Sequence, residues 1–329
     1  MKKPTIKDVA SLSGVGTGTV SRVLNGGSVK ETTRIKVIRA IEKLGYQPNQ
    51  TARTLAGGKT RRILFLMPEA RTEFHWRVMK SFDDFLGMMN YEMVIYPVFS
   101  DRRLNRLKKD SSLLEDSEGA VICTMNTGLL AENNIDFGNN VVLFEAQSEE
   151  FDCVYLDNIM GGKMAAELLI DCGSSDFFII SFEEENPILA TENFEKRIEG
   201  FTGVLEKKGY EFNQERLVYT SFFLETAYEN IAKILTEHDK PGIFALADNF
   251  ALEVLQIASA LKKIPGKDFF LIGYDNQSWT ERAGLTTIEQ PMEDMGRRTA
   301  ELIVQKIEAP GQYIQPVKFL PKMKRRRTA

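Results

Sequence analysis

Apolar residues at helical spacing mark the first helices of the chain, in residues 5–25. Thr5 suits a helix cap, Asp8 suits the first helical turn, and Gly14 suits the left-handed residue that ends a helix. The pattern therefore predicts two short helices joined by a tight turn. The side chains expected to be buried between them are Ile6, Val9, Ala10, Leu12, Val15, Val20, Val23 and Leu24.

The outer face of the second helix has the small and polar residues that a helix in the major groove of DNA would use to meet bases and phosphates. The residues on this face are Thr17, Gly18, Ser21 and Arg22, and the further candidate DNA contacts around it are Thr5, Thr19 and Asn25. A small packed helical hairpin without a ligand is the alternative that this stretch leaves open.

A third helix is predicted over residues 32–44 and is expected to end at Gly45. Asn49 can cap a further short helix that ends before Gly57, and a helix of this length is not stable by itself. An unstructured linker, with Leu55 packed on the rest of the protein, is the alternative. The buried stripe of the third helix is expected to consist of Ile35, Ile38, Ile41 and Leu44.

From Ile63 onward, apolar strand-like runs alternate with helical segments. The expected strands are 63–67, 92–98, 119–123, 141–145, 176–181, 216–220, 242–247 and 268–275. The expected helices are 78–89, one from 101, 161–173, 194–209, 226–238, 249–263 and 292–307. This alternation predicts an α/β fold with two parallel sheets, hence two lobes, with a ligand near the carboxyl ends of the strands. Neither glycine pattern typical of nucleotide binding opens any of these helices.

Charge divides the chain into a basic and an acidic part. Residues 1–62 contain thirteen Lys and Arg against three Asp and Glu, and the whole chain has a net charge of −4, so the remaining 267 residues carry −14. A basic part attracts phosphate whatever the base sequence, whereas an acidic part is repelled by it. We therefore expect the N-terminal part to contact DNA; a merely solvated basic surface is the alternative.

Composition narrows the class of protein. The 329 residues are 43% hydrophobic and 27% charged, as in soluble globular proteins of more than one domain. No apolar run approaches the roughly 20 residues that cross a bilayer, and the N-terminus lacks the apolar core of a signal peptide. Cys123, Cys153 and Cys172 show no metal-ligand spacing. We expect free thiols, no metal, no cofactor, no membrane partner and a cytoplasmic location.

Several phrases of the sequence are specific enough to suggest a family. In the N-terminal part they are TIKDVA, GV, TVSRVLN and ETTRIKVIRAIEKLGYQPNQTARTL; in the rest they are VYLDN, EKRIEGF, FALAD, LIGYDN, LTTIEQP and FLP. Together they resemble the lactose/galactose-repressor (LacI/GalR) family of bacterial transcription factors over nearly the whole chain. The resemblance implies an α/β protein with an N-terminal all-α helix-turn-helix headpiece and a two-lobed, periplasmic-binding-protein-like core with parallel sheets.

The resemblance also implies the domains. They are a DNA-binding headpiece at 1–48, a hinge helix and linker at 49–60, and an effector-binding and dimerisation core at 61–329. Lobe 1 of the core would hold about 61–160 and 291–320, and lobe 2 about 161–290. In the family, two hinge helices meet in the minor groove of DNA and push a leucine between base pairs. Leu55 matches that leucine here, and the other hinge candidates are Asn49, Ala52 and Arg53.

An effector site between the lobes is a further implication of the resemblance. Carboxylates and an arginine would bind the hydroxyl groups of a sugar, and aromatic rings would stack on its apolar face. Arg197, Asp248 and Asp275 match family positions that contact the effector. The other candidates are Phe74, Trp76, Glu145, Phe222 and Trp279. Core packing of the aromatic residues, and structural ion pairing of Arg197 and Asp248, are the alternatives.

Departures from the family pattern leave the ligand open. Residues 69–76 read EARTEFHW, which puts Glu69, Arg71 and Glu73 at the expected mouth of the site. Glu145 is followed by alanine, where an Asp-Arg pair is frequent in the family. These departures argue against a typical neutral-sugar site. The site could take a phosphorylated or otherwise charged sugar or another metabolite, or it could take none, with a protein corepressor acting instead.

The sequence thus predicts a sequence-specific DNA-binding transcriptional regulator. No catalytic triad, acid/base carboxylate pair or activated cysteine indicates an enzyme. We predict a repressor that binds a near-palindromic operator as a homodimer, with a tetramer left open, and responds to a sugar or sugar derivative. A small-molecule binding protein or enzyme without a DNA role is the more distant alternative. The basic cluster at 322–327, KMKRRR, is expected to be a disordered, solvated tail.

Overall fold

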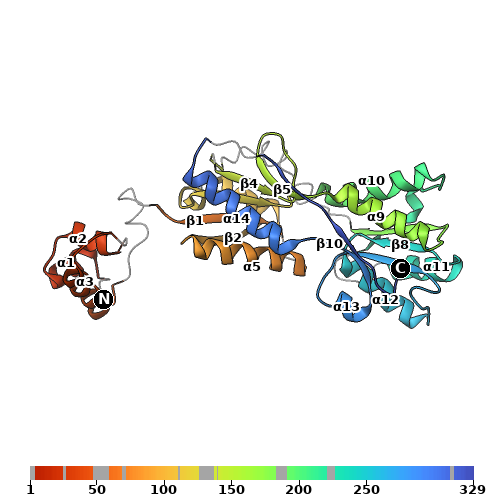
Figure 1. Cartoon of the computed structure of the whole chain (residues 1–329), viewed down its shortest axis with the longest axis horizontal. Helices are drawn as coiled ribbons and strands as arrows, with labels where there is room; N and C mark the ends of the chain where they lie inside the picture. The colour runs from red at the N-terminus through yellow and green to blue at the C-terminus, as the bar shows by residue number, and fades with distance from the viewer. Residues whose placement is uncertain are drawn as a thin grey trace. The chain divides into compact units, whose positions relative to one another are not determined.

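The computed structural model divides the chain into two compact units, Met1–Thr60 and Arg61–Ala329 (Figure 1). It describes residues 4–24, 27–46, 59–68, 72–109, 112–125, 137–138, 140–182, 191–220, 227–311 and 315–329. Within those ranges, no helix is long and apolar enough to cross a membrane. Cys123 and Cys153 are buried free thiols, and Cys172 is a half-buried one.

The N-terminal unit is a helical headpiece, as predicted. Its helices are α1 (Ile6–Ser13), α2 (Thr17–Leu24) and α3 (Glu31–Leu44). The carboxylate of Asp8 accepts a 2.7 Å hydrogen bond from the Thr5 backbone N–H, so an acidic side chain completes the first turn of α1. Gly14 (φ 70°) and Gly45 (φ 58°) end α1 and α3 in the left-handed conformation, which confirms both predicted stops.

The predicted buried stripe of α3 was wrong in its first half. Ile35 and Ile38 are each 42% exposed, whereas Val37 and Ala40 face the core of the headpiece. Residues 37, 40, 41 and 44 follow the same three- and four-residue spacing as the predicted set, so two overlapping faces of this helix look equally regular in the sequence. The larger isoleucines made the wrong face look the more hydrophobic one. Leu12, predicted to be buried in α1, is 45% exposed.

Lobe 1 of the second unit is built on a parallel sheet. Its strands, in spatial order, are β11 (Val317–Phe319), β5 (Asp152–Leu156), β4 (Val141–Phe144), β3 (Gly119–Cys123), β1 (Arg62–Met67) and β2 (Glu92–Pro97). Side chains of β1 alternate between two apolar layers, Ile63 and Phe65 in one and Leu64 in the other. The first layer contains α5 (Glu73–Met88) and α14 (Met292–Glu308); the second contains α6 (Asp101–Lys109), followed by α7 (Ser112–Glu115).

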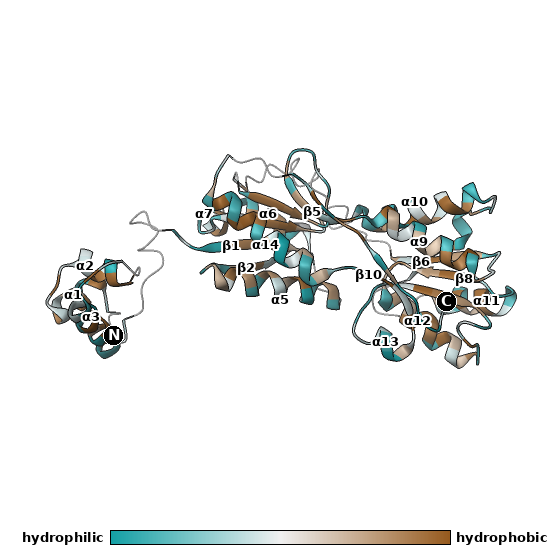
Figure 2. Cartoon of the chain, viewed as in Figure 1, coloured by the Kyte–Doolittle hydropathy of each residue, from teal (hydrophilic) through white to brown (hydrophobic). Residues whose placement is uncertain are grey.

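Lobe 2 has a second sheet with the strand order β12 (Lys322–Lys324), β10 (Thr286–Glu289), β9 (Phe270–Asp275), β8 (Gly242–Ala245), β6 (Phe177–Phe182) and β7 (Leu217–Thr220). The ladders are parallel except the one between β10 and β12. Its helices are α9 (Asn158–Asp171), α10 (Glu192–Lys207), α11 (Tyr228–Glu237), α12 (Asp248–Ala260), α13 (Thr280–Ala283) and the 3-10 turn Gln214–Arg216. Figure 2 shows hydrophobic strands inside both lobes and hydrophilic outer helix faces.

The chain passes from one lobe to the other after β5, after β10 and after β11. The carboxyl ends of several strands therefore lead into residues that lie between the lobes. Glu145 follows β4, Asn158 follows β5 and opens α9, and Gln290 follows β10. Asp275 is itself the last residue of β9. This arrangement brings polar residues distant in sequence to one place, as expected for parallel sheets.

The prediction that the basic cluster at 322–327 is disordered was wrong, although the side chains of Lys322, Arg325 and Arg327 are exposed to solvent. Lys322–Lys324 form β12, which pairs with β10 in antiparallel register. Thr328 is 1% exposed, so the segment after the cluster is buried rather than solvated. A run of charged and flexible side chains is typical of a solvated segment, and the sequence does not show that the backbone of this one pairs with a strand.

Candidate functional site

The structure gives a candidate DNA contact surface on the headpiece. Thr17, Gly18 and Arg22 are exposed on α2, as is Thr5 beside it, while Thr19 and Ser21 are half-buried. The Arg22 Nε lies 3.4 Å from the carbonyl oxygen of Gly18, a long contact that leaves the guanidinium available to a partner. The remaining DNA candidates, which lie outside the described residues, are Asn25, Asn49, Ala52, Arg53 and Leu55.

A second candidate site is a cluster of buried polar side chains between the lobes. Lobe 1 contributes Glu145 and lobe 2 contributes the other members, from the starts of α9 and α10 and the end of β9. Each of these side chains is at most 7% exposed. We call this set the interlobe cluster; it consists of Glu145, Asn158, Asn193, Arg197, Tyr274 and Asp275.

Glu145 connects the two lobes within this cluster. Its Oε1 accepts from the backbone N–H of Leu156 at 2.9 Å, and its Oε2 accepts from Asn193 Nδ2 at 3.1 Å. Burial raises the pKa of Glu145 to about 7, although the positive charge of Arg197 opposes the shift. A carboxyl group that titrates near neutral pH thus lies where lobe 1 meets α10 of lobe 2.

Arg197 is held in place by acceptors of lobe 2. Its Nε donates to Asn158 Oδ1 at 2.8 Å and one terminal nitrogen donates to the carbonyl of Leu246 at 2.5 Å. Its guanidinium carbon lies 3.6 Å from the centre of the Tyr274 ring, and the Tyr274 hydroxyl also donates to Asn158. The guanidinium is therefore fixed in direction before any ligand binds.

Asp275 and Asp248 are buried carboxylates whose pKa values are both raised, chiefly by burial. Asp275 Oδ1 accepts from Gln290 Nε2 at 2.6 Å, and burial raises the pKa of Asp275 to about 6. Asp248 accepts from the Thr287 hydroxyl at 2.6 Å and the Gln277 N–H at 2.8 Å; burial and the charge of Asp275 raise its pKa well above the usual value. Among the residues that the structure describes, the buried amide oxygen of Gln290, beside Asp275, has no hydrogen-bond donor.

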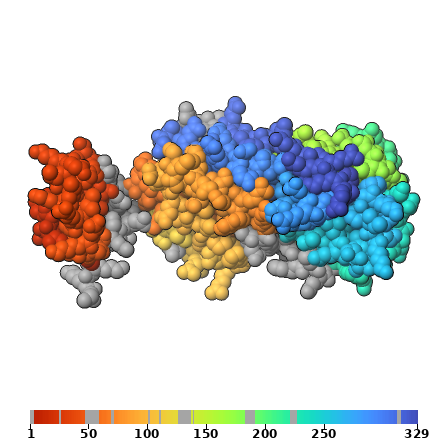
Figure 3. Space-filling model, turned by 60° about the horizontal axis from the view of Figure 1, so that its bottom comes forward, coloured from red at the N-terminus to blue at the C-terminus, as the bar shows by residue number. Residues whose placement is uncertain are grey.

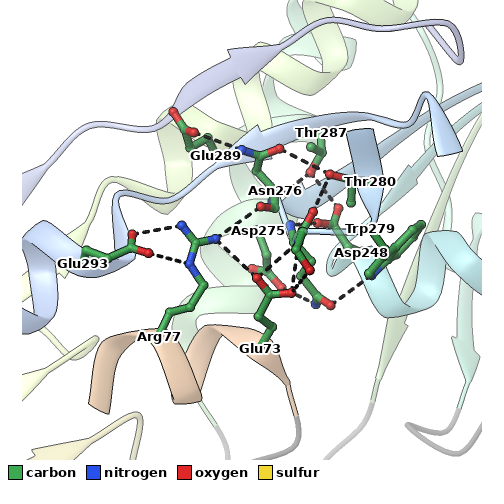
Figure 4. Close-up of polar contacts among 12 residues, drawn as sticks. Glu73, Arg77, Asp248, Asp275, Asn276, Trp279, Thr280, Thr287, Glu289 and Glu293 are labelled. Carbon is green, nitrogen blue, oxygen red and sulfur yellow. Dashed lines mark hydrogen bonds and ion pairs between the residues drawn. The ribbon is translucent and has the colours of Figure 1, made fainter. Parts of the chain in front are cut away.

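Around the cluster, α5 of lobe 1 contacts the loop after β9 (Figure 4). A carboxylate oxygen of Glu73 accepts from the backbone N–H and the hydroxyl of Ser278, at 3.0 and 2.7 Å. Arg77 forms a bidentate ion pair with Glu293, at 2.7 and 2.9 Å, and reaches the carbonyl of Asn276 at 3.4 Å. The contacts of Glu73 with Ser278 and of Arg77 with Asn276 join the two lobes on the side of β9, whereas Glu293 belongs to α14 of lobe 1 and fixes Arg77 within that lobe.

The predicted aromatic platforms are dispersed. Phe74 is 6% exposed and stacks on Phe144 in the core of lobe 1, whereas Trp76 is 65% exposed. Trp279 is half-buried and its Nε1–H donates to Gln277 at 3.1 Å. Phe222 lies outside the described residues, as do Glu69 and Arg71. The structure therefore brings together Glu145, Arg197 and Asp275, with Asp248 beside them, whereas the rings of Phe74 and Trp76 are not part of the cluster.

Comparison with known proteins decides the family. Residues 5–49 match the bacterial regulatory proteins of the lacI family, and residues 166–329 match a periplasmic binding protein-like domain. Catabolite control protein A of Priestia megaterium is 30% identical over 308 residues, which cover 91% of each chain. The chain belongs to the LacI family. This LacI-family chain is a DNA-binding transcriptional regulator, and the predicted resemblance and fold class are confirmed.

Solved structures support the same fold for this LacI-family regulator. The complex of the transcriptional regulator CelR with cellobiose is 26% identical, with a TM-score of 0.71 over 99% of this chain and all of that one. The lac repressor dimer bound to operator and an anti-inducer has a TM-score of 0.83 over 99% of both chains. At 18% identity the second likeness shows the fold alone.

The sequence prediction missed several members of the site. Asn193 contacts both Glu145 and Asn158, and Gln290 contacts Asp275, yet neither was singled out. A signal for Asn193 was present, because it lies one helical turn before Arg197 and so on the same face of α10. No signal of this kind marks Gln290, whose contact with Asp275 follows from the pairing of β10 with β9.

Proposed function

We propose that this LacI-family regulator is a repressor that binds a near-palindromic operator as a homodimer and is controlled by a small molecule bound between its lobes. The observation that carries the proposal is the interlobe cluster, in which Glu145 of lobe 1 lies with Arg197 and Asp275 of lobe 2. A ligand that contacts both lobes there would favour one interlobe arrangement over another, and this differential affinity is what control requires.

A sugar or sugar derivative is the proposed effector class. Fixed donors on Arg197 and acceptors on Glu145 and Asp275 suit a molecule with several hydroxyl groups. The CelR structure contains cellobiose, and a LacI-family regulator from Enterococcus faecium, 25% identical to this chain, contains ribose. Burial already raises the pKa of Glu145 and of Asp275, so the site disfavours further negative charge such as that of a phosphorylated sugar.

The DNA role is tested by selecting bound sequences from a random DNA pool with the purified full-length protein. We expect a near-palindromic site whose affinity falls steeply with salt, because the basic N-terminal part releases counterions from phosphates. Repeating the selection in the presence of cellobiose, ribose or sucrose tests whether a sugar changes operator binding. Recovery of an asymmetric site, or of none, would exclude the dimeric operator.

The effector site is tested separately by calorimetry of the same sugars with the wild-type protein and Asp275→Asn. We expect heat of binding for at least one sugar and its loss in the variant, since Asp275 accepts rather than donates hydrogen bonds. A sugar that shifts operator affinity equally in both proteins would exclude the cluster as the site. If no sugar binds, control by a protein corepressor becomes the better hypothesis.

A further inference from the structure

The segment that follows β12 is a fixed part of lobe 2. The backbone N–H of Arg327 donates to the carbonyl of Gly284 at 3.0 Å, and that of Leu271 donates to the carbonyl of Thr328 at 2.9 Å. The Thr328 hydroxyl donates to the Leu271 carbonyl at 2.6 Å. In Figure 3 the dark blue C-terminal residues lie against the surface of the body. The side chains of this segment therefore have defined positions.

Arg326, within this segment, contacts the loop that follows β9. One terminal nitrogen donates to Asn276 Oδ1 at 2.8 Å. The other donates to the carbonyl of Leu285 at 2.7 Å and lies 3.4 Å from the Thr280 hydroxyl. A guanidinium is a planar, rigid set of donors, so one side chain holds both ends of residues 276–285 at fixed separation.

The same loop has an unfavourable backbone conformation. Asp275 has φ 116° and Asn276 has φ 55°, although neither residue is glycine. Asparagine tolerates the left-handed angle of Asn276, but the angle of Asp275 persists only when the surroundings hold it. The adjacent Asn276 side chain is held by Arg326 and by Glu289, which accepts from its Nδ2 at 2.9 Å. Without these bonds the loop would relax toward ordinary angles.

This loop is also the part of lobe 2 that meets α5 of lobe 1. Ser278 donates to Glu73, and the carbonyl of Asn276 faces Arg77 (Figure 4). The conformation held by Arg326 is thus the one that presents these groups to lobe 1. We propose that Arg326 is a positioning residue, which couples the C-terminal segment to the contact between the lobes. The inference rests on the proposed function in one respect, that movement between the lobes controls operator binding.

Hydrogen exchange of the full-length protein tests this assignment in two regions, the loop 275–280 and the start of α5 at 73–78. For Arg326→Gln we expect exchange about tenfold faster in both regions. The loop loses its hydrogen bonds to the charged guanidinium, and Glu73 of α5 then loses its contact with Ser278. Arg325→Gln is the charge control, since Arg325 is exposed and adjacent. Thr328→Val is the packing control, since it removes the hydrogen bonds of the Thr328 hydroxyl with Leu271 and Thr286, which both lie outside the loop.

Three results would overturn the assignment. They are unchanged exchange at 73–78 in Arg326→Gln, an equal change in Arg325→Gln, or an equal change at 73–78 in Thr328→Val. If Arg326→Gln does not fold, Arg326→Lys replaces it, with the same outcomes expected because one ammonium cannot reach Asn276 and Leu285 together. Operator affinity is measured on the same proteins. A wild-type protein that binds no operator would count against the proposed function. The exchange at 73–78 decides the role of Arg326 whether or not the protein binds an operator.

Discussion

At the scale of single residues, the carboxyl of Glu145 links proton binding to the contact between the lobes. Its pKa is raised from 4.5 to about 7 by burial. The folded protein therefore binds a proton more tightly there than the unfolded chain. The stabilisation from this group is complete below about pH 4.5 and is lost as the pH rises to about 7.

Glu145→Gln removes this titration. We expect the difference in free energy of unfolding between wild type and variant to change by up to roughly 3 kcal/mol between pH 4.5 and 7.5, in favour of the variant at the higher pH. Urea unfolding at a series of pH values measures it. Asp275 titrates nearby in both proteins, so only the difference between the two curves is informative; parallel curves would refute the assignment.

Arg22 is the residue for which the headpiece makes the sharpest prediction. It is exposed on α2, and the long contact of its side chain with the Gly18 carbonyl leaves the guanidinium open to DNA. We expect Arg22→Ala to weaken binding to a selected operator by roughly 1 to 3 kcal/mol and to relax base preference at one position. Lys36→Ala, an exposed charge on α3, serves as the comparison. Equal losses on specific and random DNA for Arg22→Ala would assign it to phosphate contact.

At the scale of secondary-structure elements, α9 and α10 approach closely through glycines. A methyl group on Gly200 would lie 2.0 Å from the Ile159 carbonyl oxygen, and one on Gly162 would lie 2.0 Å from that of Arg197. The backbones are therefore nearly in contact. This packing sets the positions of Asn158 on one helix and Arg197 on the other.

Gly200→Ala should therefore force the two helices apart. We expect a loss of about 1 to 3 kcal/mol in unfolding free energy from overpacking. Gly203→Ala is the matched control, because it lies on the same helix with open space around its Cα. Helix propensity alone should make that control up to about 1 kcal/mol more stable. Chemical denaturation of both variants measures the contrast, and similar stabilities would refute the close approach.

The elements also show how far the sequence could predict the fold. Alternating apolar runs sufficed for the βα order, because each buried strand of a parallel sheet is hydrophobic on both faces. The buried face of α3 and the pairing of β12 could not be predicted, because both depend on which distant segment covers them. At the site, Arg197 and Asp275 were found through a motif, whereas Asn193 and Gln290 are defined only by contacts between lobes or strands.

At the scale of the whole molecule, Glu73 offers a test of the contact between the lobes. It accepts two hydrogen bonds from Ser278 across the two lobes. Glu73→Ala removes both, and we expect a wider distribution of interlobe distances and altered operator affinity without an effector. Glu92→Ala is the control, since Glu92 is an exposed acidic residue of lobe 1 on strand β2. Small-angle X-ray scattering and a binding titration would detect the change; identical profiles would show that the Ser278 contact does not hold the lobes.

The repeated passage of the chain between the lobes bears on how such proteins can be recombined. Lobe 1 takes its edge strand β11 and lobe 2 its edge strand β12 from one segment, residues 317–324, with only Leu320 and Pro321 between the strands. Neither lobe is contiguous in the gene, so no single crossover point could exchange a complete lobe with a relative. The headpiece has a core of its own within residues 9–46. A single recombination event could therefore exchange the headpiece for that of a relative, whereas the two lobes would have to be exchanged together.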